Sequence, residues 1–273
     1  VRSSGEVSAL LGVDREALAR AGFHGSPGQA LVIPRSEGPV LVAVGLGDPP
    51  TLTSAQVRDA AAAFARATAS HTHVGVDLSG DHGLPDREIA QAVVEGVLLA
   101  RYRFTELKPT ATSVPLESLQ LLTTDAQAEG VRAGADVGAT TSRATALARD
   151  LANNPPGHLT ATRMADVAVA LGERHGVTVE TFDKKQLIEL GCGGLLGVNA
   201  GSAEEPRMIV MTYTPAGTPT AHVALVGKGI MYDAGGISLK PSDAMHLLMK
   251  MDMAGAGAAL AAMTALKDLG VTP

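Results

Sequence analysis

The sequence predicts an α/β protein of two domains, each with a mostly parallel or mixed sheet that is flanked by helices. The first observation behind this prediction is that short apolar segments alternate along the chain with longer segments of helical periodicity. The second is the length of 273 residues, which is enough for one to two domains. The third is that aromatic residues make up 3% of a chain that is 45% hydrophobic. Small aliphatic side chains must therefore form the core, and they favour close layers of helices on sheets.

We assign residues 1–140 to an N-terminal α/β domain. Its predicted strands are short apolar runs bounded by turn residues, at 30–34, 40–44, 73–78 and 118–122. Its predicted helices carry apolar residues at helical spacing, at 56–70 and 87–101. A long helix is expected from about residue 125 to residue 151, where two asparagines and two prolines prevent its continuation. We place the domain boundary on this helix, near residue 140.

Residues 141–273 are predicted to form the first portion of a second α/β domain. Its predicted helices are at 161–175, 184–190 and 252–268, and Thr160 is a candidate N-cap for the first of them. Its predicted strands are at 177–182, 208–213 and 222–226. The last of these is wholly apolar over 223–226 and is predicted to be a central strand, buried on both faces. Because a parallel sheet would continue with a further strand after the last helix, we expect this C-terminal domain to be incomplete.

Charge, cysteine content and hydropathy argue against several partners and locations. The net charge of −6 argues against a nucleic-acid or anionic-membrane partner, because little positive charge is available to neutralise phosphates. The longest apolar run, at 253–266, is shorter than the roughly 20 residues that a membrane-spanning helix needs. The single cysteine, Cys192, excludes an intrachain disulfide and is typical of a reducing compartment. We therefore expect a cytoplasmic protein, and we interpret Cys192 as a small buried apolar residue rather than a nucleophile.

Several short motifs that define common enzyme classes are missing from the sequence. We find no P-loop, no GxGxxG fingerprint, no HExxH or CxxC pair and no GxSxG elbow. The eight histidines are scattered, and we assign no role to His222 or His246, which lie closest to the segment described next.

Four of the charged residues in the long loop that follows the predicted central strand are candidates for a site. They are Lys228, Asp233, Lys240 and Asp252. Loops at the carboxyl ends of strands are where open α/β sheets bind ligands, and two converging carboxylates favour divalent cations. The alternatives remain open at this point: Asp233 can be a turn residue before two glycines, Asp252 can be an N-cap, and both lysines can be exposed turn residues.

Lys228 is an unusual metal ligand. A protonated amine has no lone pair. Holding a lysine neutral at pH 7 costs about 4.6 kcal/mol, because its ordinary pKa is ~10.4. A divalent cation at bonding distance can offset that cost. Without a metal, a buried lysine would need a carboxylate partner.

The segment that starts at Val226 resembles the signature of the leucyl (cytosol) aminopeptidase family, the M17 metallopeptidases. It reads VGKGIMYDAGGISLKPSDAMHLLMKMDMAGAGAA, and the family pattern is GKGxx[FY]D[ST]GGx[SN][IL]KP followed by MKxDM[GC]GAA. Two upstream stretches, ARDLANNPPGHLT and LLGVNAGSAEEPRMIVMTY, also resemble parts of that family's catalytic domain. The resemblance covers residues 140–273 well, and it covers the N-terminal part only in architecture.

The resemblance implies a role for each of these four charged residues. Lys228, Asp233 and Asp252 would be metal ligands, with Asp233 bridging two metal ions. Lys240 would be the catalytic lysine that polarises the scissile carbonyl. The two divalent ions, Zn²⁺ or Mn²⁺, would activate a water molecule for hydrolysis, and the free amine of a peptide substrate would bind one of them. The implied activity is release of leucine-like N-terminal amino acids from peptides.

Met249 and Lys250 share one turn of this segment. The resemblance implies that Met249 lines the pocket for the first side chain of the substrate, and the alternative is a core methionine. Lys250 is expected to face solvent or a neighbouring residue.

One part of the family pattern is not in these 273 residues. The motif NTDAEGR, which supplies two more carboxylate ligands and an arginine in the family, is missing. Two explanations stay open: a fragment of an ordinary aminopeptidase, or a truncated, non-catalytic relative with a binding or structural role. On either, we expect this chain alone to be inactive. The family also implies a homo-oligomer, a hexamer.

Overall fold

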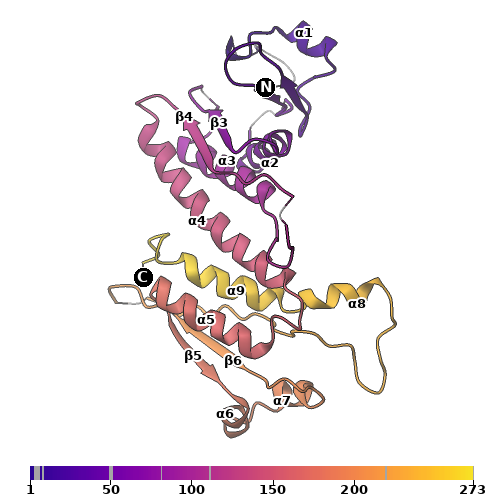
Figure 1. The fold of residues 1–273 in the computed structure, drawn as a ribbon. Helices are drawn as coiled ribbons and strands as arrows, with labels where there is room; N and C mark the ends of the chain where they lie inside the picture. The colour runs from indigo at the N-terminus through magenta and orange to yellow at the C-terminus, as the bar shows by residue number, and fades with distance from the viewer. Residues whose placement is uncertain are drawn as a thin grey trace. The chain divides into compact units, whose positions relative to one another are not determined.

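The computed structural model describes residues 1–2, 7, 9–48, 52–80, 82–110, 112–218 and 220–272. The chain divides into two compact units, Val1–Ser142 and Arg143–Pro273. Both units contain helices and small sheets, so the predicted α/β class is confirmed (Figure 1). Among the described residues, no helix combines the length and the apolar character that crossing a membrane requires.

The described residues of the first unit form two small sheets and several helices, three of which pack on one another. Its elements are η1 (Ala9–Leu11), α1 (Arg15–Arg20), β1 (Ala30–Ile33), β2 (Leu41–Val44), α2 (Ser54–Ala67), β3 (His73–Asp77), α3 (Asp86–Arg101), β4 (Ser118–Leu122) and the first part of α4 (Ala128–Asn153). Strands β1 and β2 are antiparallel, whereas β3 and β4 are parallel with His73 opposite Ser118. The buried apolar cluster of this unit joins α2, α3 and α4 through Val57, Ala61, Ala65, Ile89, Val93, Val97 and Val131.

Glycines allow the helices of the first unit to approach closely. A Cβ atom on Gly96 of α3 would lie 2.3 Å from the carbonyl oxygen of Arg58 on α2. A Cβ atom on Gly134 of α4 would lie 2.1 Å from the carbonyl oxygen of Arg87 on α3. Real Cβ atoms do not reach such distances, so only glycine permits these backbone contacts.

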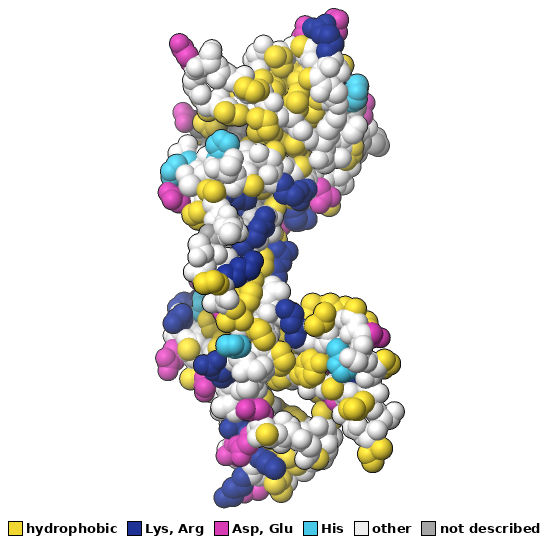
Figure 2. Space-filling model, turned by 45° about the vertical axis from the view of Figure 1, so that its right-hand side comes forward, with side chains coloured by type: hydrophobic (Ala, Val, Ile, Leu, Met, Phe, Trp, Pro, Cys, Tyr) yellow, Lys and Arg dark blue, Asp and Glu magenta, His cyan; other side chains and the backbone are white. Residues whose placement is uncertain are grey.

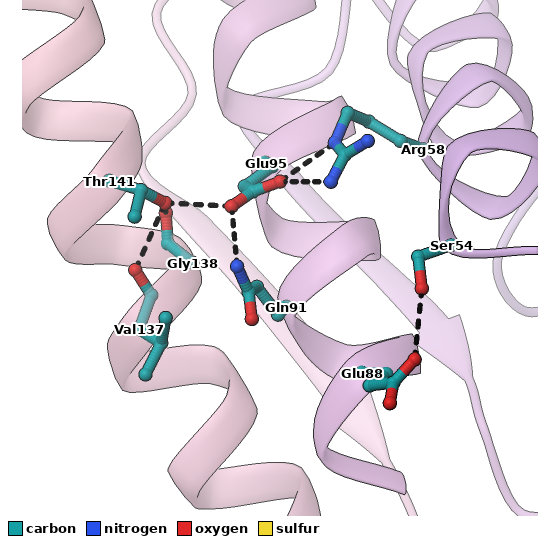
Figure 3. Close-up of polar contacts among 8 residues, drawn as sticks. All are labelled: Ser54, Arg58, Glu88, Gln91, Glu95, Val137, Gly138 and Thr141. Atoms are coloured by element: carbon teal, nitrogen blue, oxygen red, sulfur yellow. Dashed lines mark hydrogen bonds and ion pairs between the residues drawn. The ribbon is translucent and has the colours of Figure 1, made fainter. Parts of the chain in front are cut away.

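A carboxylate, Glu95 of α3, links these three helices from within (Figure 3). Its Oε1 accepts hydrogen bonds from Gln91 Nε2 at 2.9 Å and from Thr141 Oγ1 of α4 at 2.8 Å. Its Oε2 accepts from Arg58 Nε of α2 at 2.7 Å and forms an ion pair with Arg58 Nη2 at 2.7 Å. Both oxygens are therefore satisfied, as a buried charge requires.

The described residues of the second unit form one small sheet, the end of α4 and the helices that follow it. Its elements are the end of α4, α5 (Ala161–His175), β5 (Thr178–Phe182), α6 (Lys184–Glu189), α7 (Gly193–Asn199), β6 (Met208–Thr212), α8 (Ala244–Leu248), η2 (Met249–Met251) and α9 (Ala254–Ala265). Strands β5 and β6 are antiparallel, with Thr178 opposite Thr212. Helix α5 packs against both strands and against α9 (Figure 1). Thr160 caps α5 by accepting a hydrogen bond from Arg163 N, as predicted.

The prediction of a buried central strand at 222–226 is wrong. Residues 221–230 belong to no strand, and the side chains of Val223 and Val226 are 85% and 95% exposed. Strand β6, the nearest strand before this segment, pairs with β5 in a sheet of two strands. An apolar run becomes a buried strand only where neighbouring strands and helices cover it. Within the described residues, no strand pairs with this segment.

Exposed apolar side chains continue beyond that segment into α8. The most exposed are Val223, Leu225, Val226, Ile237, Leu239, Met245 and Leu247. Figure 2 shows hydrophobic side chains on the surface of the part of the second unit that carries α8 and the loop before it.

The interpretation of Cys192 as a buried residue is wrong, because Cys192 is half-buried and occupies the N-cap position of α7 without a side-chain capping bond.

Candidate metal and catalytic site

The backbone of Gly227 and Lys228 lies directly against the first turn of α9. Ala256 N donates a hydrogen bond to the carbonyl oxygen of Lys228 at 2.9 Å. A Cβ atom on Gly227 would lie 2.4 Å from the carbonyl oxygen of Gly255 and 2.5 Å from Ala256 Cα. The glycine-rich start of α9 and the glycine before Lys228 therefore allow a close contact that a larger residue would prevent. This contact, rather than a strand end, positions Lys228.

Lys228 and Asp252 form an ion pair at one end of the candidate site. Lys228 Nζ lies 2.8 Å from Asp252 Oδ1, and the two side chains are 62% and 36% exposed. The N-cap residue of α9 is Met253, without a side-chain capping bond. The alternative that Asp252 caps this helix is therefore wrong, and its carboxylate is directed to the lysine instead.

Asp233 begins a tight turn that brings Lys240 back toward it. Its Oδ1 accepts a hydrogen bond from Gly235 N at 2.8 Å, so the alternative of a turn residue is confirmed. Gly235 has a φ of 102°, and a Cβ atom on it would lie 2.7 Å from the carbonyl oxygen of Ser238. Lys240 N then donates to the carbonyl oxygen of Ala234 at 3.0 Å.

Lys240 connects this turn to the turn η2. Its Nζ donates to the backbone carbonyl of Asp233 and lies 3.3 Å from Met249 Sδ. Lys240, Met249 and the backbone of Asp233 are thus neighbours. The carboxylate of Asp233 accepts its hydrogen bond from Gly235, within its own turn. Met249 is half-buried, and the contact with Lys240 places its sulfur at the candidate site.

Tyr232 and His246 support the loop that carries Lys240. His246 Nε2 lies 3.0 Å from the carbonyl oxygen of Lys240, and its Nδ1 lies 3.1 Å from the Tyr232 hydroxyl. A carbonyl oxygen only accepts hydrogen bonds, so Nε2 carries the proton and donates. In the neutral ring, Nδ1 then accepts from the tyrosine. Sequence reasoning missed this pair, because residues 14 apart across an irregular loop give no periodic signal.

The donor atoms of the candidate site fit a divalent metal ion in their chemistry. Lys228 and Asp252 present one nitrogen and one oxygen at the same point, and zinc accepts both kinds of ligand. Among the described residues there is no cluster of three or more His, Cys, Asp or Glu side chains that could hold a metal ion. The predicted metal ligands are two carboxylates, of Asp233 and Asp252, and the amine of Lys228. They are not such a cluster, because the third ligand is a lysine.

Comparison with known proteins identifies the family to which these features belong. The fold is a two-unit α/β protein with a lysine–aspartate site beside its last helix. Residues 146–272 match the model of the catalytic domain of the cytosol aminopeptidase family, and residues 7–110 match the model of that family's N-terminal domain. The chain belongs to the cytosol aminopeptidase family, as the sequence motifs predicted.

Similar curated proteins carry the name probable cytosol aminopeptidase. The chain is 37% identical over 292 aligned residues to the one from Chlorobaculum tepidum, covering 99% of this chain and 57% of the relative. It is 39% identical to the one from Chloroherpeton thalassium, covering 84% of this chain and 50% of the relative. The chain thus spans about half the length of the curated relatives it matches.

Two solved structures are similar along nearly the whole chain. The bottromycin maturation enzyme BotP in complex with Mn is 37% identical to this chain, with a TM-score of 0.81. A second structure of BotP is 39% identical, with a TM-score of 0.83. Each comparison covers 99% of this chain and 55% of the BotP chain.

Proposed function

We propose that this chain belongs to a metal-dependent aminopeptidase, which removes leucine-like N-terminal residues from peptides. The observation that carries the proposal is the 2.8 Å contact between Lys228 Nζ and Asp252 Oδ1. Two residues 24 apart in the sequence, both predicted as metal ligands, meet beside α9. Membership of the cytosol aminopeptidase family supports this proposal, and so does the similarity to BotP, one structure of which is a complex with Mn.

Lys228, Asp233 and Asp252 are the residues that would hold two divalent ions, Zn²⁺ or Mn²⁺. For Lys228 this requires its amine to be neutral, so metal binding releases a proton and is favoured by rising pH. When bound, such ions polarise a carbonyl group and lower the pKa of water. A carboxylate has two oxygens with several lone pairs, so Asp233 can bind a metal ion while its Oδ1 keeps the hydrogen bond from Gly235.

The other residues of the site bind and orient the peptide. Lys240 would donate hydrogen bonds from its ammonium group to the carbonyl oxygen of the scissile bond, where negative charge develops. Its present acceptor, the carbonyl of Asp233, keeps the ammonium at the edge of the site. Met249, next to Lys240, would contact the first side chain of the peptide, and a thioether suits leucine-like groups.

The setting of the proposed enzyme follows from the same family. The names of the relatives support a cytosolic location and peptide substrates with a free amino terminus. Exposed apolar side chains over 223–247 support self-association, and we propose a homo-oligomer, a hexamer, as the assembled form.

A Mn²⁺ titration of the 273-residue chain, followed by electron paramagnetic resonance of the free ion, tests the ligand assignment. We expect saturable binding that Lys228→Met and Asp252→Asn each weaken about tenfold or more. Lys240→Met should leave Mn²⁺ binding unchanged, because Lys240 is assigned to the substrate. Equal affinity in the wild type and both ligand variants would contradict the proposal.

Hydrolysis of leucine p-nitroanilide with added Mn²⁺ or Zn²⁺ separates enzyme from binding protein. Release of p-nitroaniline that Lys240→Met abolishes identifies an aminopeptidase. Metal binding without hydrolysis is the result expected for this chain alone. The intact mass of the purified natural protein then tests the alternative, a truncated subunit of the same family with a binding or structural role: a mass of 27.8 kDa indicates that subunit, and a larger mass indicates the enzyme.

A further inference from the structure

Lys250 connects the turn η2 to the end of α4. Its Nζ donates a hydrogen bond to the backbone carbonyl of Asn153 at 3.2 Å, and this bond is partly buried. Asn153 is the last residue of α4. The last carbonyls of a helix lack partners within the helix, and the helix dipole favours a positive charge there. Of the two options expected for Lys250, solvent or a neighbouring residue, the second is confirmed, and the neighbour is the backbone of Asn153.

The sequence that ends α4 places this acceptor. In a longer helix, the carbonyls of Leu151 and Ala152 would accept from the N–H groups of residues 155 and 156. Both of these are prolines, which have no N–H group, so the helix cannot continue. The sequence therefore fixes where α4 ends in the second unit, and a side-chain donor can form a hydrogen bond with a carbonyl at that end.

The turn that Lys250 ties down carries residues of the candidate site on both sides. Met249 comes directly before it and lies against Lys240. Asp252 comes two residues after it and pairs with Lys228. Asp252 N donates to the carbonyl oxygen of Met249 at 3.1 Å, so the four residues 249–252 form one closed turn. Fixing one side chain of such a turn restricts the others.

Burial alone does not hold this turn in place. None of the residues of η2 is buried, and Met251 is 45% exposed. The next residue that is anchored in the core is Met253, which is 1% exposed and belongs to the same apolar cluster as Leu151 of α4. Packing of Met253 and the hydrogen bond of Lys250 thus tie the two sides of Asp252 to the same helix end.

We infer that Lys250 is a positioning residue, whose hydrogen bond to Asn153 holds the 249–252 turn so that Asp252 faces Lys228 and Met249 faces Lys240. The hydrogen bond of Lys250 is observed whatever the function of the chain is. The roles of Asp252 and Met249 rest on the proposed function. Lys250 touches neither the peptide nor the metal in this proposal, and it acts through the turn.

Hydrogen exchange of the 249–253 amides tests the positioning without any metal. Lys250→Met keeps the length and apolar contacts of the side chain but removes the donor, and we expect exchange in this segment to become at least about fivefold faster. Lys250→Arg keeps a charged donor and should restore most of the protection. The matched control is Lys185→Met on α6, an 85% exposed lysine, which should leave the segment unchanged. Unchanged exchange in Lys250→Met would overturn the inference.

Mn²⁺ binding by the same variants tests the consequence for the site. We expect Lys250→Met to weaken Mn²⁺ binding about tenfold, which is the size seen when a group that orients a metal ligand is removed. Lys250→Arg should recover binding to within about threefold of the wild type, a rescue that mere loss of packing would not show.

The Asp252→Asn variant distinguishes the two proposals. If Asp252→Asn loses Mn²⁺ binding and Lys250→Met keeps it, the inference about Lys250 is overturned and the proposed function stands. If the wild type binds no Mn²⁺, the metal assignment fails, and hydrogen exchange still decides the positioning role.

Discussion

At the scale of single residues, Glu95 is a buried carboxylate that serves the fold rather than the candidate site. Burial by itself raises the pKa of Glu95. Hydrogen bonds from Gln91, Thr141 and Arg58, together with the positive charge of Arg58, outweigh burial and leave the pKa below its ordinary value of 4.5. Ionised Glu95 therefore stabilises the folded first unit, by the linkage between proton binding and folding.

Glu95→Gln should lower the free energy of unfolding by about 2 kcal/mol at pH 7, because it replaces hydrogen bonds to a charged group with neutral ones. The folded-state pKa is lowered, so the stabilisation is complete above pH 4.5 and disappears as the pH falls through the lowered folded-state value. Urea unfolding of both proteins from pH 7 to pH 3 should show the difference shrinking below pH 4.5.

Glu16→Gln is the matched control for that experiment. Glu16 pairs with Arg20 on the surface, with side chains 80% and 67% exposed, so we expect a change within about 0.5 kcal/mol at every pH. A Glu95→Gln difference that stays constant down to pH 3 would contradict the assignment of the stabilising charge to Glu95.

At the scale of elements, the candidate site depends on contacts between backbones rather than on a strand end. The start of α9 has glycine or alanine at 254–259, and Gly227 lies against it. This close approach is what brings Lys228 within reach of Asp252, which precedes the same helix. The small residues of α9, which by themselves predict a helix packed on most sides, thus have a specific partner in the loop.

Gly227→Ala should displace Lys228 from α9, because its Cβ would overlap backbone atoms that cannot rotate away. We expect a loss of about 1–3 kcal/mol in the free energy of unfolding and weaker Mn²⁺ binding. Gly236→Ala, in the same loop, has no atom within 4 Å of its added Cβ and should change neither quantity measurably. Equal behaviour of the two variants in urea unfolding and Mn²⁺ titration would refute the close contact.

At the scale of the whole molecule, the apolar residues of the second unit fall into two groups. One group forms the core between α4, α5, α9 and the sheet, around Leu151, Met164, Met253 and Leu260. The other group is exposed, and its members are Val223, Leu225, Val226, Ile237, Leu239, Met245 and Leu247. Burial of apolar surface is what stabilises a fold, so the two groups should differ in what they contribute to the stability of this chain.

Substitutions in buried and exposed positions should separate these contributions. Leu260 belongs to the core group and is 5% exposed, and Leu260→Ala should lower the free energy of unfolding by about 2–5 kcal/mol. Val226→Ala should change it by less than about 0.5 kcal/mol, because a side chain that is 95% exposed has no burial to lose. A loss above about 1 kcal/mol for Val226→Ala in this chain, measured by urea unfolding, would show that the segment is covered after all.

Much of the element order could be predicted from the sequence, because its signals are local. The periodicity of α2, α3 and α5, the Thr160 cap and the prolines after α4 depend on neighbours within a few residues. The short helices α1, α7 and α8 escaped prediction, because helices of five to seven residues carry few periodic positions, although α6 of similar length was predicted. The strand predicted at 222–226 failed because burial of a strand depends on distant neighbours.

The sequence by itself determined the α/β class, the family and the identity of the candidate residues, because motif spacing and periodicity are written in the order of the chain. Tertiary structure alone decided which of those residues meet: Lys228 with Asp252, Lys240 with Met249, and Lys250 with the end of α4. The physical reason is that these contacts join segments that are distant in the sequence. Such segments meet only where α4 and α9 pack and their backbones come close, which local helix or strand propensity does not determine.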